Sequence, residues 1–326
     1  MGKQRTASGL IGILGLFMLI LDSKTAFTGA YNGLTLCIQT LIPSLFPFFL
    51  FSSMLSGALS GREIPMLSVF GKWFHIPKGV EHLLLSAFLG GYPVGAQSVY
   101  SAYRSGSLSK ADAQRLLAYC SNAGLAFLFG VVSQMFDTYK TIWFLWGIHI
   151  LSAWMVSILF PWENQIDCTK TVSNSPAGLP MYQALKSMGL VCGWVILFRV
   201  IIEFLNRWFL WLLPGNITVA VIGLLELSNG CCMLHLIENN DLRFLICSGI
   251  LAFGGLCVTM QTLSIIEDLS PRNYLTGKVL QVFFSILLSL VYLRRTGYIL
   301  SAFALLGVIF YGKFKKISRN PEKAIV

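Results

Sequence analysis

One stretch of apolar sequence, from residue 84 to residue 130, is interrupted twice. The first interruption reads GGYPVG (residues 90–95) and the second reads SNAG (residues 121–124). Inside a bilayer, the backbone groups freed by such breaks need partners, so broken helices occur only where they are buried in protein or line a polar cavity. Transporters build their solute sites near the bilayer midplane from such segments. The stretch therefore predicts a membrane protein that binds and moves a solute.

The composition supports a membrane protein of many spans. Of the 326 residues, 55% are hydrophobic and only 12% are charged, whereas soluble domains carry about 25% charged residues. A helix needs about 20 apolar residues to cross a bilayer. We therefore predict an all-α, polytopic protein with about eight to ten membrane elements, in two repeats with broken helices and re-entrant hairpins.

The net charge of +10 does not indicate nucleic-acid binding. Lys and Arg cluster in the termini and short loops, as the positive-inside rule predicts for a protein of the cell membrane. The chain has no long basic arm and no basic face interleaved with aromatic residues, which nucleic-acid binding would favour. The expected surroundings are the lipid bilayer.

The chain divides into two near-equal halves at its one long polar stretch. The expected parts are a first membrane half over 1–162 with broken segments 81–103 and 111–136, a polar linker over 163–180, a second membrane half over 181–313 with broken segments 217–236 and 242–266, and a basic cytoplasmic tail over 314–326.

Several single elements are predicted within these halves. Pro43 and Pro47 predict a helix that is kinked or begins late, and the amphipathic segment 61–79 predicts an interfacial element. In the second half, spans are expected over 184–205, 278–293 and 298–311.

The direction of the chain at 81–103 is open to two interpretations. If this segment crosses the membrane, Arg104, Lys110 and Arg115 lie outside, against the charge rule. If it is a re-entrant hairpin with its tip at 90–95, they stay inside. We favour the hairpin.

The two halves show a weak internal repeat. In each half, one broken segment is followed by a second broken segment. By motif, GGYPVGAQ (90–97) aligns with GGLCVTMQ (254–261), and SNAG (121–124) aligns with SNG (228–230). The two motif alignments use different registers, so they cannot both reflect common descent.

Polar and glycine residues at these interruptions are the candidate substrate-binding residues, together with one arginine in an apolar helix. They are Gly91, Tyr92, Pro93, Gly95, Gln97, Asn122, Gly124, Arg199, Glu226, Ser228, Asn229 and Gln261. Ionisable residues at membrane depth are costly and therefore indicate function.

Three charged candidates have competing interpretations. Arg199 and Glu203 are spaced i, i+4, so they form either an internal salt bridge or a fork for a substrate carboxylate, with Glu203 positioning it or handling a proton. Glu226 either caps freed N–H groups or serves as a protonatable coupling or contact group. Glu203 and Glu226 are the coupling candidates.

Nothing in the sequence indicates an enzyme, a cofactor or a metal site. It holds no nucleophile, metal-protease or phosphate-binding motif. Its eight cysteines show no CxxC spacing, so we expect small core residues. Cys231, Cys232 and His235 share a helix face, but a lone histidine on an apolar face is more often a core residue than a metal ligand.

Four motifs together resemble a known family. FPFFLFSSML (46–55), FLGGYPVGA (88–96), LSKADAQRLLAYCSNAGLAFLFGVV (108–132) and GLLELSNG (223–230) resemble the YlbJ-type sporulation integral membrane proteins, also called stage V sporulation protein V. This family belongs to the nucleoside-recognition (Gate) domain group and is similar in organisation to concentrative nucleoside transporters. The resemblance runs over about residues 41–293, and it departs from the family pattern at Leu125, where a proline is expected.

The resemblance implies export of dipicolinic acid from the mother cell across the outer forespore membrane. Dipicolinate is a flat aromatic dianion. Helix N-termini at the breaks suit an anion, Arg199 is a positive partner, and Tyr92 offers a ring for stacking. The alternatives are a nucleoside or other small-metabolite permease and a non-transporting sporulation assembly factor. A homo-oligomer is compatible with the sequence, which sets neither the coupling ion nor the oligomeric state.

Overall fold

The computed structural model describes residues 2–59, 65–77, 79–160 and 180–294. Every regular element within these ranges is a helix. Five helices are long and apolar enough to cross a membrane, namely Ser23–Leu59, Tyr139–Leu159, Pro180–Trp208, Asn240–Ile265 and Arg272–Tyr292. The prediction of an all-α, polytopic membrane protein is confirmed. The predicted linker, except for its last residue, the span at 298–311 and the basic tail lie outside the described residues.

The first half begins with one long helical rod and continues through short helices. Its elements are α1 (Gly2–Leu21), α2 (Ser23–Leu36), a π turn (Cys37–Leu41), α3 (Ile42–Leu59), α4 (Pro65–Trp73), α5 (His82–Leu85), a second π turn (Ser86–Gly90), α6 (Val94–Arg104), α7 (Lys110–Leu116), α8 (Leu125–Gly130), a 3-10 turn (Val132–Met135) and α9 (Tyr139–Leu159). The helix passes through Pro43 and Pro47, and the first π turn immediately precedes them.

The second half repeats this order of elements. They are α10 (Pro180–Trp208), a 3-10 turn (Leu210–Leu212), α11 (Gly215–Leu225), α12 (Leu227–Cys232), a 3-10 turn (Leu234–Leu236), α13 (Asn240–Phe253), α14 (Gly255–Ile265) and α15 (Arg272–Tyr292). The helix predicted to begin at Lys278 begins at Arg272 instead, because Pro271 precedes the first turn and Lys278 is buried inside the helix. The span predicted over 184–205 extends to Pro180–Trp208.

The segment 81–103 folds back on itself. A methyl group added at Gly95 would lie 3.1 Å from the Cα atom of Ala87, although eight residues of straight helix span about 12 Å. The reversal occurs at Gly91–Pro93, where Gly91 has a φ of 74°, which favours glycine. The segment thus forms a hairpin, as favoured from the charge distribution, and its entry from the cytoplasmic side stays a prediction.

A second hairpin occupies the same place in the second half. Gly230 of α12 packs directly against the backbone of Gly223 in α11, and the chain turns between them at Glu226, which has extended backbone angles. Two glycines at this contact let the two backbones approach closely. Each half therefore contains a long helix, a hairpin, an interrupted helix and a final long helix.

The interrupted helices follow the hairpins. Residues 121–124 carry no regular structure between α7 and α8, and Gly254, with a φ of 80°, separates α13 from α14. The repeat by order is therefore present. Both motif alignments are wrong as structural equivalences. GGYPVG forms a hairpin tip, whereas GGLCVTMQ begins at the break of an interrupted helix. SNAG lies at the break of an interrupted helix, whereas SNG lies beside a hairpin tip.

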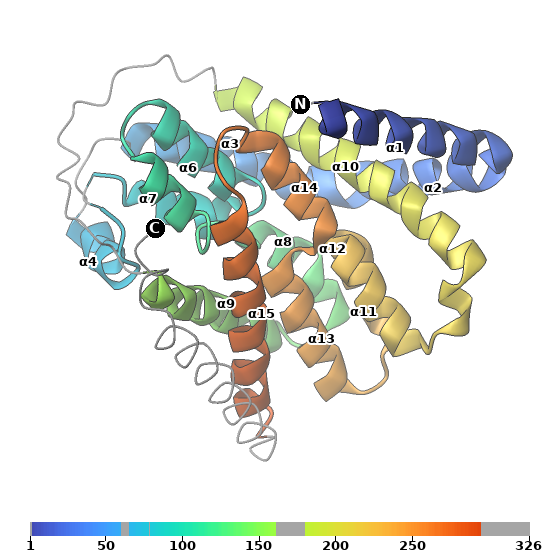
Figure 1. The fold of residues 1–326 in the computed structure, drawn as a ribbon. Coiled ribbons are helices and arrows are strands. Elements are labelled where there is room, and N and C mark those ends of the chain that lie inside the picture. The colour runs from blue at the N-terminus through green and yellow to red at the C-terminus, as the bar shows by residue number, and fades with distance from the viewer. Residues whose placement is uncertain (1, 60–64, 78, 161–179, 295–326) are drawn as a thin grey trace, which may run out of the picture.

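The first elements of the two halves pack antiparallel along their length. Gly29 of α2 meets Val200 of α10, Gly33 meets Ile196, and the Ser53 hydroxyl of α3 donates to the Gln183 side chain at 2.9 Å. Residue numbers thus rise in one helix as they fall in the other (Figure 1). Equivalent elements that run in opposite directions define an inverted repeat, as in many transporters.

Candidate functional site

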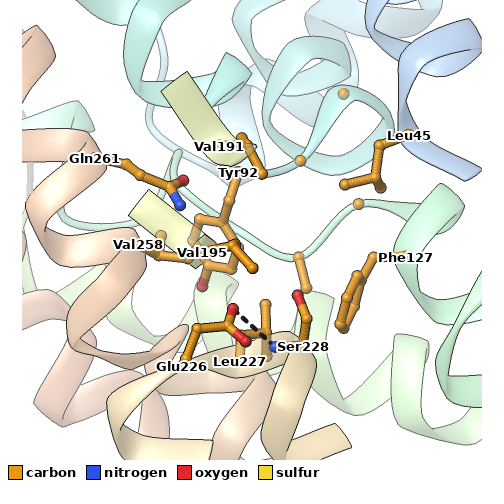
Figure 2. Close-up of a pocket in the computed structure, with 14 residues that line it drawn as sticks. Leu45, Tyr92, Phe127, Val191, Val195, Glu226, Leu227, Ser228, Val258 and Gln261 are labelled. Carbon is orange, nitrogen blue, oxygen red and sulfur yellow. Dashed lines mark hydrogen bonds between the residues drawn. The ribbon is translucent and has the colours of Figure 1, made fainter. Parts of the chain in front are cut away.

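The interruptions meet around one cavity of about 30 Å³ (Figure 2). The two hairpin tips and the break after α7 line it directly, and α14 lines it one turn beyond the fourth break. The lining residues are Leu45, Gly90, Gly91, Tyr92, Ala123, Gly124, Phe127, Val191, Val195, Glu226, Leu227, Ser228, Val258 and Gln261.

Close packing borders this cavity. A methyl group added at Gly124 would lie 3.0 Å from the backbone nitrogen of Gly91, and one added at Gly254 would lie 3.0 Å from the Tyr92 ring. The volume suits one or two water molecules. The cavity is therefore narrow, and a larger solute requires the surrounding elements to move.

Six of the twelve predicted substrate-binding residues line the cavity, namely Gly91, Tyr92, Gly124, Glu226, Ser228 and Gln261. The other six lie around it. Among these, Pro93 and Gly95 complete the first hairpin tip, Gln97 accepts a hydrogen bond from Ser187 at 2.7 Å, and Asn122 is fully buried.

Asn122 stabilises its own break. Its side-chain amide donates to the Tyr119 carbonyl at 2.7 Å, and its side-chain oxygen accepts from Gln281 at 2.8 Å. Ala123 beside it donates its N–H to the ring nitrogen Nε2 of His149 at 3.0 Å. The second interruption is thus fixed by side chains of α9 and α15.

Glu226 caps the second hairpin. Its Oε1 accepts from the Ser228 N–H at 3.0 Å, and its Oε2 accepts from the backbone and side-chain nitrogens of Asn229, both at 2.6 Å. Of its two interpretations, the structure shows the cap. The same carboxyl group lies in the cavity wall (Figure 2).

Arg199 and Glu203 form the predicted salt bridge, with 3.2 Å between Nη2 and Oε2 and about four-fifths of each side chain buried. The Nη1 atom of Arg199 also donates to Asn229 at 3.1 Å. A polar chain therefore runs from Glu203 through Arg199 and Asn229 to Glu226. Arg199 lies one turn beyond Val195, which lines the cavity, but Arg199 does not line it.

Two central residues, Phe127 and Lys278, are not among those predicted from the sequence. Phe127 lines the cavity, and nothing distinguishes it from the other 23 phenylalanines in the sequence. Lys278 is fully buried. A signal for it exists, because the polar residues Lys278, Gln281, Ser285 and Ser289 recur at helical spacing along one face of α15, and all four are buried.

Comparison with characterised proteins gives one significant relative. Over 132 residues, the chain is 26% identical to the Sporulation integral membrane protein YlbJ of Bacillus subtilis (strain 168). The chain is similar to YlbJ. The match covers 39% of this chain and 32% of YlbJ, so it spans about a third of that relative's length. The YlbJ similarity and the long apolar helices indicate a multi-pass integral membrane protein with a relative in sporulation.

Two further comparisons found nothing. No family model matches the chain, and no solved structure is significantly similar to it.

Proposed function

We propose that the chain transports a small organic anion, dipicolinate, from the mother cell toward the forespore by alternating access across the outer forespore membrane. One observation carries the proposal, namely that interrupted segments from both halves of the chain line one small cavity. Transporters with inverted repeats place their solute sites there. A scaffold has no need of broken helices at membrane depth, where each freed backbone group requires a partner.

The cavity wall suits a flat ring. Tyr92 and Phe127 both face the cavity, and Gln261 directs its amide toward it (Figure 2). That amide donates a hydrogen bond to the sulfur of Cys257 at 3.3 Å, and sulfur is a weak acceptor. Gln261 therefore has a donor for a solute, and the two rings offer stacking faces.

Two positive side chains lie close behind the cavity wall, and they support an anion as the solute. Lys278 donates a hydrogen bond to the Tyr92 hydroxyl at 2.8 Å, which places a positive charge directly behind the cavity wall. Arg199 is one helical turn from the wall. The carboxylate of Glu226 is engaged by three hydrogen bonds within the α12 cap.

The name of the relative supports a role in sporulation. YlbJ is named a sporulation integral membrane protein, and dipicolinate is the solute implied by the resemblance to that family. A nucleoside is the second candidate, because the aromatic pair and the Gln261 amide also suit a nucleobase.

Thermal unfolding of the purified protein with different solutes tests this proposal. Ligands that bind the folded state raise the apparent stability, so dipicolinate is expected to raise the Tm in a saturable manner. Val258→Trp fills the cavity and is expected to abolish the shift. Leu256→Trp is the matched control, because Leu256 is on the same helix and 41% exposed.

Each alternative has its own outcome. A Tm shift with nucleosides instead of dipicolinate would identify a nucleoside permease. No shift with any solute, together with a partner protein that co-purifies stoichiometrically, would identify an assembly factor.

A further inference from the structure

Lys278 is a fully buried lysine at the centre of the molecule. Its ammonium donates to the Tyr92 hydroxyl at 2.8 Å, the Gln281 side-chain oxygen at 2.9 Å, the Ser121 carbonyl and, at 3.4 Å, the Ala252 carbonyl. Within the described ranges, no carboxylate bonds this ammonium. A charge at this depth is costly unless its surroundings are arranged to bind it.

The two backbone carbonyls belong to the two interrupted helices. Ser121 lies at the break between α7 and α8, and Ala252 lies in the last turn of α13, before Gly254. Carbonyls at helix C-termini lack intrahelical partners and carry partial negative charge. One ammonium therefore satisfies a break in each half of the molecule.

This arrangement is the one that binds ions in other transporters. In inverted-repeat transporters, unwound carbonyls and the C-terminal ends of half-helices coordinate the Na⁺ ion. Here the same kinds of carbonyl groups already surround a covalently attached cation.

The ammonium is also coupled to the cavity wall. It lies 4.8 Å from the centroid of the Tyr92 ring, which lines the cavity, and the Tyr92 hydroxyl donates to the Leu251 carbonyl at 3.3 Å. Gln281 links the same cluster to Asn122 at 2.8 Å. Movement of Tyr92 on solute entry would therefore disturb the ammonium and both breaks together.

We propose that the Lys278 ammonium takes the place of a coupling metal cation, so that this chain binds no Na⁺ at its central breaks and works without one. This proposal for Lys278 rests on the proposed transport function, but the measurements that test it do not require transport. Lys278 is a positioning residue here, because it acts on the cavity through Tyr92 and the breaks.

The first measurement uses the wild-type protein. Its Tm is expected to stay unchanged when NaCl is replaced by N-methylglucamine chloride at constant ionic strength. A saturable rise in Tm with Na⁺ would overturn the proposal. This measurement decides the question even if variants at position 278 fail to accumulate.

The second measurement uses Lys278→Ala, which leaves a cation-sized space between the same carbonyls. Its Tm is expected to fall by several degrees and to recover, saturably, with ammonium, methylammonium or Na⁺, but not with the larger tetramethylammonium. Lys186→Ala, at an exposed position of α10, is the matched control and is expected to respond to none of them. A Lys278→Ala protein that is as stable as wild type, or that no small cation stabilises, would contradict the proposal.

These outcomes separate the two proposals. If the protein moves no dipicolinate but Lys278→Ala gains a small-cation site, the transport proposal fails and the inference about Lys278 stands. If dipicolinate transport requires Na⁺, the inference fails and the transport proposal stands.

Discussion

At the residue scale, the central polar side chains fall into two groups. Glu226, Asn122 and Lys278 use their hydrogen bonds within the protein, where they fix the breaks. Gln261 is buried in the cavity wall with only a sulfur acceptor. The first group shapes the cavity, and Gln261 is the side chain most free to bind a solute.

Gln261→Leu is expected to weaken dipicolinate binding with little change in Tm. A hydrogen bond to a charged group contributes about 1.5–3 kcal/mol, so the Kd should rise roughly 10- to 150-fold. Titration of the purified variant by calorimetry checks this. Gln134→Leu, at an exposed position, is the control, and equal affinities for the Gln261 variant and wild type would remove Gln261 from the site.

The sequence predicted part of this centre at the residue scale. Tyr92, Glu226 and Gln261 were identified because polar residues beside glycine breaks are conspicuous in apolar sequence. Lys278 was missed because a lysine at the edge of a hydrophobic run is ordinarily a boundary. Its burial depends on carbonyls from Ser121 and Ala252, which are far away in the sequence.

At the element scale, the breaks depend on glycines where two backbones touch. A methyl group at Gly124 would lie 2.9 Å from the Leu89 carbonyl oxygen and 3.0 Å from the Cα atom of Gly91. Neither backbone atom can move without shifting the hairpin tip. The contact between the first hairpin and the second break is therefore specific to glycine.

Gly124→Ala is expected to lower the free energy of unfolding by about 1–3 kcal/mol, because overpacking forces backbone shifts. Gly189→Ala is the control, since nothing lies within 4 Å of the added methyl group, and alanine in a helix gains up to about 1 kcal/mol over glycine. Thermal unfolding of both variants measures the difference. Equal stability of the two variants would show that the hairpin and the break do not touch.

Asp22 joins the start of α2 to the end of α10. The Thr25 hydroxyl and backbone N–H donate to its carboxylate, and Arg207 Nε lies 2.9 Å away. The hydrogen bond from the Thr25 hydroxyl does most to hold the pKa of Asp22 below its ordinary value. The hydrogen bond from the Thr25 backbone N–H and the charge of Arg207 lower this pKa further. A lowered pKa stabilises the fold above the pKa of the unfolded chain, and this stability is lost as the pH falls through the folded-state pKa.

Asp22→Asn is therefore expected to lower the Tm at pH 7 and to flatten its decline below about pH 4. Melting curves between pH 7 and pH 3 test this, with the exposed Asp137→Asn as the control. An unchanged acid slope in Asp22→Asn would show that this cap and ion pair do not contribute.

At the scale of the whole molecule, the two halves share one order of long helix, hairpin, interrupted helix and long helix, and their first long elements run antiparallel. The order of broken segments was predicted from the sequence, whereas the two motif alignments paired segments that form different structures. Gly91 lies where the chain reverses, whereas Gly254 lies at the break of an interrupted helix. A short glycine motif looks the same in both places, so it cannot predict which of the two structures forms. The direction of each half depends on contacts such as Gly33 with Ile196, which no local pattern encodes.

A cysteine pair tests the antiparallel packing of α3 and α10. Ser53→Cys with Gln183→Cys is expected to cross-link with a short bifunctional thiol reagent, because the native side chains are in contact at 2.9 Å. Ser53→Cys with Trp208→Cys should not, since 25 residues of helix separate positions 183 and 208 by about 38 Å. Gel mobility measures the cross-linking of both cysteine pairs, and the single-cysteine variants show the mobility without a cross-link. The reverse result would require parallel halves.

The uptake of labelled dipicolinate by proteoliposomes tests the central claim most directly. Wild-type protein is expected to take up dipicolinate faster than empty vesicles do. Uptake by the Leu256→Trp variant should match that of wild type, and uptake by the Val258→Trp variant should fall to the level of empty vesicles. The two variants differ because Val258 lines the cavity and Leu256 does not. Uptake no faster than in empty vesicles, or equal uptake by Val258→Trp and Leu256→Trp, would contradict a transporter whose solute site is this cavity.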